Sequence, residues 1–579
     1  MEVCVLMGLT KKDVVQHLED IAIYLELKGE NQFRISAYRK AAQNIEADIR
    51  SLKEIDDFKS IKGIGDGTND IIKEYINEGT SEVFKNLKNE IPEGLIPLLK
   101  LPGIGGKRLA TLYEELDVVD LESLQHVCET GAVEKVKGFG KKTTENILKA
   151  ISSLNKQPER LPISIMLPLA EKIHAALNSI EEVKKSSIAG SIRRMEETIK
   201  DIDFIIATDH PKLVTEKILL LDGINEVIAS GETKTSVSIK EGTYLINIDF
   251  RLIRPEEYPT TLHHFTGSKE HNIAMRQRAK KRGEKINEYG VEIEESGKLI
   301  QFQTEEEFFH HFNLEFIPPE VRVDGNEVSK FESAPNLIKR EMIKGDLHMH
   351  TTWSDGAESI EDMVQFARNL NYDYLAITDH SKYLRVANGL NEKRLRQQRK
   401  EIERLNEKYS DILILSGVEM DILPNGELDF DSEFLKEMDI VIAAIHSSFS
   451  QSEAEIMKRL ETACKNPYVD IIAHPTGRLI GHREPYAVNM QQLIQLAKES
   501  NTALEINAHP QRFDLSAKWA NEAQKQGVNI AINTDAHRTN TLNYMDYGVS
   551  VGKKAWLKPE SVINTWDKSD LLAFINRNK

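Results

Sequence analysis

The 579-residue sequence has few cysteines, no long apolar run and no excess of positive charge. Its three cysteines, Cys4, Cys128 and Cys464, are too few and too scattered for a disulfide framework or a cysteine-based zinc site, which fits a reducing compartment. No apolar run approaches the roughly 18 residues of a membrane span, and the first residues lack the pattern of a secretory signal. We therefore expect a cytoplasmic protein that is neither secreted nor embedded in a membrane.

The charge balance excludes a general attraction to nucleic acid. Lys and Arg number 75 against 92 Asp and Glu, which gives a net charge of −17. Any binding of DNA must therefore come from local features. The hydrophobic share of 40% and the charged share of 29% are average for globular proteins, and the length predicts roughly three to five domains.

Three glycine turns of one form, apolar-x-Gly-apolar-Gly, occur in the helical first part of the chain. They are Ile61 to Gly65, Leu101 to Gly105 and Val136 to Gly140, and a helical pattern follows each. A single turn of this kind is usually a helix C-cap followed by a tight turn. Three copies instead favour phosphate binding by backbone N–H groups at helix N-termini, and basic residues follow the second and third turns directly.

The next region alternates strands and helices after a break near residues 157–162, and it contains three acids with matching orientation. Asp201 and Asp203 are two residues apart, so on a strand they share one face, and Asp249 shares a face with Asn247 and Arg251. An isolated pair of this kind usually lies on a solvated strand. A third acid, together with the turn 190–194 upstream, favours a site for two divalent cations and a phosphate.

These motifs resemble the palm and thumb of the family X DNA polymerases, the group of polymerase β. The match comprises Gly190-Ser191-x-Arg193-Arg194, Asp201-x-Asp203, Asp249, Phe265-Thr266-Gly267-Ser268 and Asn272 to Arg276. The resemblance implies that Asp201, Asp203 and Asp249 are catalytic and bind Mg²⁺ or Mn²⁺. It places the nucleotide at Gly190, Ser191, Arg194, Phe265, Gly267, Lys269, Asn272 and Arg276. The glycine turns then resemble helix-hairpin-helix motifs, with DNA contacts expected from Gly63, Gly65, Gly103, Gly105, Lys107, Gly138, Gly140, Lys141, Arg34 and Tyr38.

The sequence departs from the family pattern in several places. Met195 stands where the family commonly has glycine, and Lys200 stands where it has a small residue, which predicts altered triphosphate contacts. His264 replaces a tyrosine that helps to exclude the ribose 2′-hydroxyl, so sugar discrimination is expected to differ. Relatives with lyase activity have a Schiff-base lysine where this chain has Ile71. We therefore expect binding to 5′-phosphorylated gaps without efficient lyase chemistry.

The C-terminal region alternates short apolar strands with amphipathic helices, and histidines and acids follow the strands. One histidine in such a place is usually structural, whereas a converging set suits Mn²⁺, Zn²⁺ or Fe²⁺. The set resembles the PHP (polymerase and histidinol phosphatase) domain, which implies a distorted (β/α)₇ barrel with three ions and Glu419 bridging two of them. The nine implied ligands are His348, His350, Asp355, His380, Glu419, His446, His474, Asp535 and His537. Arg478, Asn507 and Arg512 are weaker candidates for contact with the scissile phosphate.

Together the resemblances predict a multidomain protein that belongs to the bacterial family X DNA polymerases with a PHP domain. The expected domains are helix-hairpin-helix domains at 1–95 and 96–155, an α/β palm at 156–260, a thumb at 261–325, a linker at 326–340 and the PHP domain at 341–579. We expect a nucleoid-associated monomer that uses dNTPs to fill short gaps in DNA. The PHP domain would supply 3′→5′ exonuclease activity, with abasic-site endonuclease and 3′-phosphatase activities as further options.

Two alternatives are compatible with parts of the sequence. The first is a phosphoesterase whose polymerase portion is a degraded DNA-binding module. Met195 and Lys200 favour this alternative, whereas the three intact aspartates argue against it. The second is a PHP barrel that serves only as a structural support, against which the complete ligand set argues.

Overall fold

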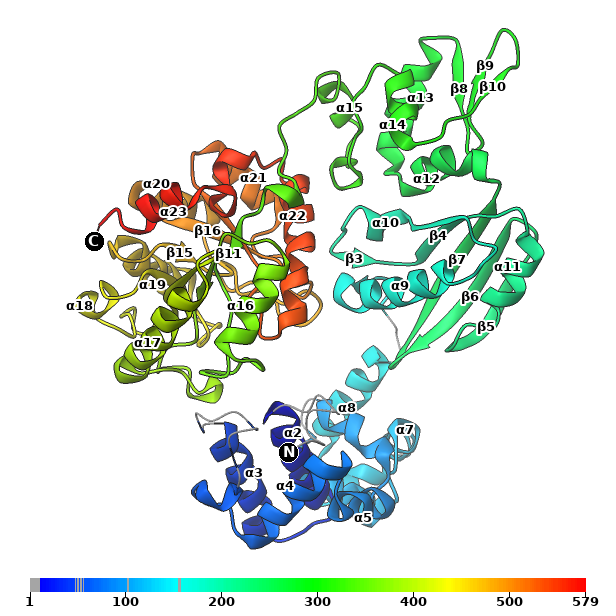
Figure 1. Cartoon of the computed structure of the whole chain (residues 1–579). Coiled ribbons are helices and arrows are strands. Elements are labelled where there is room, and N and C mark those ends of the chain that lie inside the picture. The colour runs from blue at the N-terminus through cyan, green and yellow to red at the C-terminus, as the bar shows by residue number, and fades with distance from the viewer. Residues whose placement is uncertain are drawn as a thin grey trace. The chain divides into compact units, whose positions relative to one another are not determined.

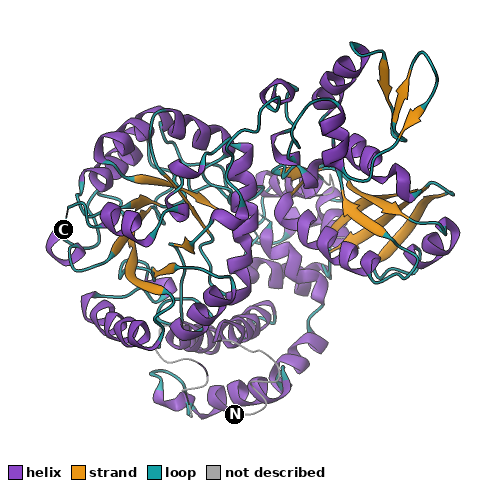
Figure 2. Ribbon diagram, turned by 45° about the horizontal axis from the view of Figure 1, so that its top comes forward, coloured by secondary structure: helices purple, strands orange, loops and turns teal. Residues whose placement is uncertain are grey.

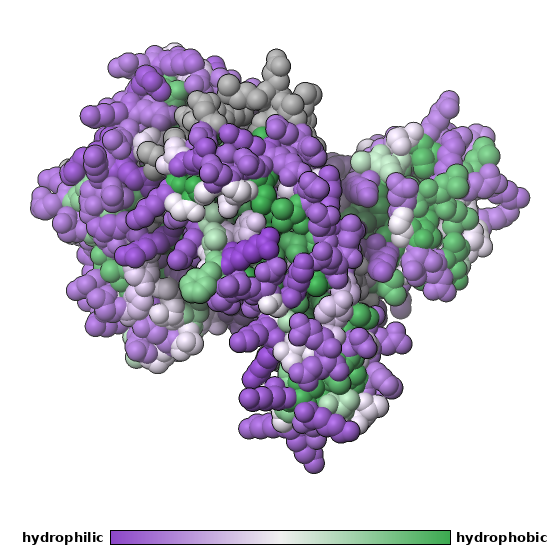
Figure 3. All heavy atoms as spheres, turned by 90° about the horizontal axis from the view of Figure 1, so that it is seen from below, coloured by the Kyte–Doolittle hydropathy of each residue, from purple (hydrophilic) through white to green (hydrophobic). Residues whose placement is uncertain are grey.

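The computed structural model describes residues 11–578 except 47, 49–51, 53–54, 56, 102–103 and 155–157. The helices before residue 158 belong to one compact unit, and most of the chain from Pro158 onward belongs to a second (Figure 1). Polar side chains cover most of the face seen in Figure 3. Within the described ranges, no helix combines the length and the apolar character needed to cross a membrane.

The N-terminal unit is helical and packs around one apolar core that contains Leu18, Ile21 and Ile72. Gly65 and Gly105 are the N-cap residues of two of its helices, and Gly63 has a φ of 88°, a left-handed conformation that favours glycine. Gly103 lies outside the described residues. The helices are α2 (Lys11–Leu27), α3 (Gln32–Glu46), α4 (Asp66–Glu78), α5 (Glu82–Glu90), α6 (Gly106–Leu116), α7 (Leu121–Glu129) and α8 (Lys141–Leu154).

The palm is a five-stranded sheet with helices packed against it (Figure 2). Its strands, in spatial order, are β2 (Lys185–Ile188), β4 (Ile202–Ala207), β7 (Tyr244–Ile253), β6 (Lys234–Glu241) and β5 (Ile224–Ser230). The central pair, β4 and β7, is parallel, and the rings of Phe204 and Phe250 stack at 5.4 Å between centroids. Helices α9 (Ile163–Asn178), α10 (Gly190–Arg193) and α11 (Pro211–Ile218) complete this region, and β1 (Leu161–Pro162) pairs with β3 (Thr198–Ile199).

The thumb combines helices with a small antiparallel sheet. Its elements are α12 (Tyr258–Thr266), α13 (Lys269–Lys280), α14 (Glu305–His311), β8 (Glu284–Ile286), β9 (Val291–Ile293) and β10 (Leu299–Ile300). The segment 326–340, predicted to be a linker, begins with α15 (Glu327–Lys330), and Val328, Phe331 and Leu337 are buried in the thumb core. These apolar side chains therefore anchor the segment to the thumb.

The C-terminal region is a nearly closed barrel of seven parallel strands, which confirms the predicted PHP fold. The strands follow chain order: β11 (Gly345–Asp346), β12 (Tyr374–Ile377), β13 (Leu413–Asp421), β14 (Ile440–Ala444), β15 (Ile471–Ile472), β16 (Ala503–Asn507) and β17 (Ile530–Asn533). Their inner residues are buried, so short apolar runs form this parallel sheet. The helices are α16 (Ile360–Asn369), α17 (Glu392–Lys408), α18 (Ser432–Leu435), α19 (Glu453–Lys465), α20 (Met490–Ser500), α21 (Ala517–Lys525), α22 (Met545–Lys554) and α23 (Lys568–Ile575).

Candidate active sites

The three acids predicted to be catalytic are neighbours on the palm sheet. Asp203 on β4 lies directly beside Asp249 on β7 in the parallel register. Along β7, Ile246 and Ile248 are buried while Asp249 points to the other face, as the alternation predicts. The prediction of a strand position for Asp201 is wrong by one residue, because β4 begins only at Ile202, after the chain bends out of β3.

The negative charges of these acids affect one another. Burial, and then the charges of Asp249 and Asp201, raise the pKa of Asp203 to about 6. Burial also raises the pKa of Asp201, while a hydrogen bond from Asn247 opposes that rise. Acids crowded in this way gain from a bound divalent cation, because the cation supplies the missing counter-charge.

Two residues of the neighbouring strand hold Asp249 in place. Ser236 on β6 lies opposite Asp249 and donates a hydrogen bond of 2.6 Å to its Oδ1. The Nζ of Lys234 lies 2.7 Å from Asp249 Oδ2. Sequence reasoning missed both residues, because only the register of β6 against β7 brings them to the acid.

The turn upstream of the acids approaches them closely. Gly190 has a φ of 63°, and a Cβ added there would lie 2.5 Å from Asp203 Oδ2, so the position requires glycine. Ser191 follows in the first turn of α10. Arg194 donates from Nη1 to the carbonyl of Thr266, whereas its Nε is buried and has no hydrogen-bond partner among the described residues. This Nε lies 3.7 Å from Glu196 Oε1, an ion pair without a hydrogen bond, so a triphosphate would compete with Glu196 for this guanidinium.

The departure at Met195 coincides with a contact between the palm and the barrel. Met195 has a φ of 52°, which explains why glycine is common there, and its carbonyl lies 3.5 Å from Lys554 Nζ. Glu196 pairs with Lys554 at 2.8 Å, and Glu197 accepts two hydrogen bonds from Arg478 at 2.8 and 3.1 Å. Arg478, a candidate for phosphate contact, is therefore engaged with the palm.

The other nucleotide-binding candidates lie on α12 and α13. The guanidinium of Arg251, beside the acids on β7, stands 4.3 Å from the ring centre of Phe265. Asn272 donates to the carbonyl of His264 at 2.8 Å. Arg276 and His264 line a cavity of about 460 Å³. Lys269 opens α13, and Gly267 lies where a Cβ would be 3.4 Å from an Arg194 nitrogen.

The predicted DNA contacts of the helical unit remain predictions. Lys107 and Lys141 are exposed at the starts of α6 and α8, two residues after Gly105 and one residue after Gly140. Arg34 is exposed on α3 and pairs with Glu30 at 3.1 Å. The side chain of Tyr38 is only 8% exposed and belongs to the helical core. Gly138 has a φ of 97°, which suits the turn.

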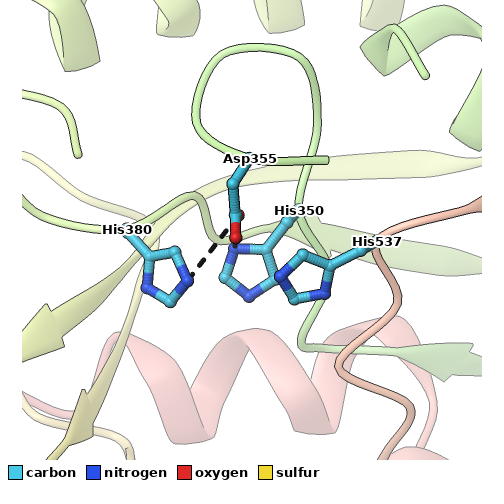
Figure 4. Close-up of side chains that lie close together, drawn as sticks. All are labelled: His350, Asp355, His380 and His537. Carbon is cyan, nitrogen blue, oxygen red and sulfur yellow. Dashed lines mark ion pairs between the residues drawn. The ribbon is translucent and has the colours of Figure 1, made fainter. Parts of the chain in front are cut away.

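The barrel brings eight of the nine predicted PHP ligands into three groups whose ligand atoms lie within 4.8 Å of one another. The groups are His350, Asp355, His380 and His537; His348, His350 and Asp535; and His380, Glu419 and His446. Figure 4 shows the first group, in which Asp355 Oδ1 lies 3.7 Å from His380 Nε2 and 3.9 Å from His350 Nδ1. The ninth residue, His474, places Nε2 2.9 Å from Glu419 Oε1.

Glu419 occupies the middle of this constellation. Its Oε1 lies 3.1 Å from His446 Nε2, and its Oε2 lies 3.4 Å from His348 Nε2. The side chain thus faces ligands of two different groups, an arrangement that supports the bridging role implied by the resemblance. Glu419 is 1% exposed, so this charge is stable only with cationic or hydrogen-bonded partners around it.

Two buried acids that sequence reasoning missed orient the histidines from behind. Glu505 on β16 lies 2.8 Å from His348 Nδ1 and accepts from the His474 backbone N–H at 2.7 Å. Asp421, at the end of β13, lies 3.2 Å from His446 Nδ1. An acid inside an apolar strand, as in the sequence Ala503 to Asn507, is the signal that could have revealed Glu505.

The neighbouring acids raise the pKa values of two of these histidines. Burial lowers the pKa of His446, but Glu419 and Asp421 outweigh burial and raise it to about 10. The pKa of His348 is also raised well above its ordinary value, since Glu505, Glu419 and Asp535 together overcome burial. The site therefore holds an excess of negative charge that attracts cations.

Comparisons with known proteins match domains and relatives of this chain. Family models match the DNA polymerase beta thumb at residues 261–323, a helix-hairpin-helix domain at 10–81 and the PHP domain at 346–509. The DNA polymerase/3′-5′ exonuclease PolX of Bacillus subtilis (strain 168) is 55% identical over 568 residues, which cover 98% of this chain and 100% of that protein. The chain belongs to the bacterial family X DNA polymerases that carry a PHP domain. A "Probable phosphatase" of Thermoanaerobacter sp. (strain X514) is 31% identical over 233 residues, 38% of this chain and 89% of that protein.

Members of this family depend on metal ions, and the donor sets fit them. The palm offers carboxylates alone, which suit Mg²⁺ or Mn²⁺. The barrel mixes imidazoles with carboxylates, which favours Mn²⁺, Zn²⁺ or Fe²⁺. His474 Nδ1 is buried and lacks a hydrogen-bond partner within the described part of the chain, so the ring has a nitrogen to spare for a ligand.

Proposed function

We propose that this protein is a DNA polymerase that fills short gaps in repair and that its PHP domain is a 3′→5′ exonuclease. The observation that carries the polymerase proposal is the pairing of Asp203 with Asp249 beside the Gly190 turn. Two divalent cations held by Asp201, Asp203 and Asp249 would activate the primer 3′-hydroxyl and neutralise the triphosphate of a dNTP. The phosphoesterase alternative is disfavoured, since Asp203, Asp249 and the Gly190 turn are all present and adjacent.

The chain's own residues position the reactants in this proposal. Ser236 and Lys234 fix the Asp249 carboxylate that faces the primer end. Ser191 and the guanidinium of Arg194 would bind the triphosphate, and Lys269 would add charge at the start of α13. Asn272 and Arg276 on α13 would line the minor-groove side of the nascent base pair, and His264, which lines the same cavity as Arg276, would influence sugar selection.

The exonuclease proposal rests on the ligand constellation at the barrel strand ends. Three ions, with Glu419 between two of them, would supply a hydroxide and clamp the scissile phosphate. Arg512 places Nε 3.7 Å from Asp535 Oδ2, and its Nη1 is buried without a hydrogen-bond partner among the described residues. We assign Arg512 to the phosphate, and Asn507, which donates to Asp535 at 3.1 Å, to the orientation of that ligand.

One experiment separates the two activities. The substrate is a labelled primer on gapped and recessed templates. It is incubated with the wild-type, Asp249→Ala or Glu419→Ala enzyme, which we expect to be a monomer, with and without dNTPs and in Mg²⁺ or in Mn²⁺. Asp249→Ala should lose extension and keep degradation, and Glu419→Ala should show the reverse. Degradation in the presence of Glu419→Ala would refute the nuclease assignment. Substrates with a 3′-phosphate test the phosphatase activity, and substrates with an abasic site test the endonuclease activity. The similarity of the barrel to a probable phosphatase favours the phosphatase activity.

A further inference from the structure

A cavity of about 800 Å³ lies against α21 and the segment that follows α22, and none of its lining residues is among those assigned to the two active sites. Five lysines line it, Lys330, Lys518, Lys525, Lys554 and Lys558, together with Trp519, Trp556 and a single acid, Glu522. The chain as a whole carries a net charge of −17. A concentration of positive charge in so acidic a protein indicates an anionic ligand.

The lysines and tryptophans of this cavity, which we name the tryptophan groove, are arranged in pairs. Lys330 Nζ lies 4.2 Å from the ring centre of Trp556, and Lys518 Nζ lies 4.8 Å from that of Trp519. Both rings are partly exposed. Trp556 also contacts Phe331, with ring centres 5.8 Å apart, so only the exposed part of each ring, beside its ammonium group, is open to a base, and this combination binds the phosphate and the base of an unpaired nucleotide.

The groove is rigid at its aromatic end. Gln524 donates to the carbonyl of Trp556 at 3.0 Å, and Asn521 donates to the carbonyl of Ala555 at 2.7 Å. These two amides of α21 fix the loop that carries Trp556. Lys554 is held by Glu196, so it contributes less charge to a ligand than the other four lysines. A preorganised aromatic surface loses little entropy when a base stacks on it.

The spacing on α21 favours a polymer over a single phosphate. Lys518 and Lys525 are seven residues apart, so they lie on one face of the helix, about 10 Å from each other along its axis. This distance separates their backbone positions, and with the side chains extended along the helix face the two ammonium groups can contact separate phosphates of an extended strand. Duplex DNA has no unstacked bases for the tryptophans.

We propose that the tryptophan groove binds single-stranded DNA outside both active sites, through Lys518, Lys525, Trp519 and Trp556. The proposal does not depend on the catalytic assignments. The strand would reach the groove as an unpaired template or as a frayed primer end, because both leave bases without partners. Lysine contacts and stacking lack base-specific hydrogen bonds, so the groove should bind with little sequence preference.

The test uses the full chain and a fluorescein-labelled oligothymidylate of 15 nucleotides, with binding followed by anisotropy. Lys518→Glu/Lys525→Glu should weaken binding at least fivefold. The slope of log affinity against log salt should fall by about 1.4, since each lost phosphate contact removes about 0.7. The matched control, Lys400→Glu/Lys436→Glu, makes the same charge change at two exposed lysines outside the groove and should bind almost as wild type does.

A second measurement isolates the tryptophans. In a Trp353→Phe/Trp566→Phe background only Trp519 and Trp556 remain, and the oligonucleotide should quench their fluorescence. Trp519→Ala should weaken binding and Trp519→Phe should restore most of it, while filling of a one-nucleotide gap, which leaves little unpaired template, reports that the enzyme is folded. Equal losses in the two double-lysine variants, an absence of quenching, or equally strong quenching by free dTTP would each overturn the proposal.

Discussion

Replacement of Asp249 by alanine separates catalysis from stability at the palm. We expect primer extension to fall by three orders of magnitude or more, because the site loses one of the three carboxylates that would hold both cations. The effect on stability should be small. Asp249 loses its hydrogen bond from Ser236, worth about 1 kcal/mol, and its pair with Lys234, whose two side chains are 38% and 30% exposed and which is worth about 0–1 kcal/mol.

A gain offsets these losses. The charge of Asp249 is the second cause of the raised pKa of Asp203, so its removal lets Asp203 ionise more easily. The net change in the free energy of unfolding should thus stay within about 1 kcal/mol. Extension is measured under single-turnover conditions and unfolding by denaturant titration, with Ser236→Ala as the control that disturbs the carboxylate without deleting it. Near-normal extension by Asp249→Ala, or a loss of several kcal/mol, would refute this reasoning.

Three further predictions concern the barrel and the N-terminal unit. Glu419→Ala should abolish 3′→5′ degradation. Mn²⁺ should support this degradation better than Mg²⁺, because imidazole ligands disfavour the harder ion. Loss of degradation in Asp203→Ala together with its survival in Glu419→Ala would contradict the assignment. Glu505→Gln should weaken Mn²⁺ binding by about 10- to 100-fold in calorimetric titrations, since it removes the acid behind His348, and an unchanged affinity would argue against that role. Borohydride should trap no strong adduct on a 5′-deoxyribose phosphate substrate, because Ile71 is buried and cannot form an imine; an adduct that disappears in Lys73→Ala would show that another lysine does this chemistry.

The pattern of neighbouring residues in the sequence was sufficient to predict much of the fold. Alternation along residues 244–253 predicted the side of the strand on which Asp249 lies, and strand-end motifs predicted that histidines and acids converge in the barrel, because each such inference needs only a few consecutive residues. The supporting contacts could not be predicted in this way. Lys234, Glu505 and Arg478 act across strands or between distant segments, and a single sequence does not give the register that joins them.

The contact between Glu197 and Arg478 bears on any attempt to divide this enzyme. A polymerase portion that ended before the barrel would keep Glu196 and Glu197 but lose Lys554 and Arg478, their basic partners. Glu196 would keep only its ion pair with Arg194, at 3.7 Å, and Glu197 would lose Arg478, so the negative charge near Arg194, where a triphosphate is expected to approach, would increase. Such a truncated polymerase would repel its own nucleotide, so a low activity after domain deletion would report altered electrostatics and not a missing catalytic group.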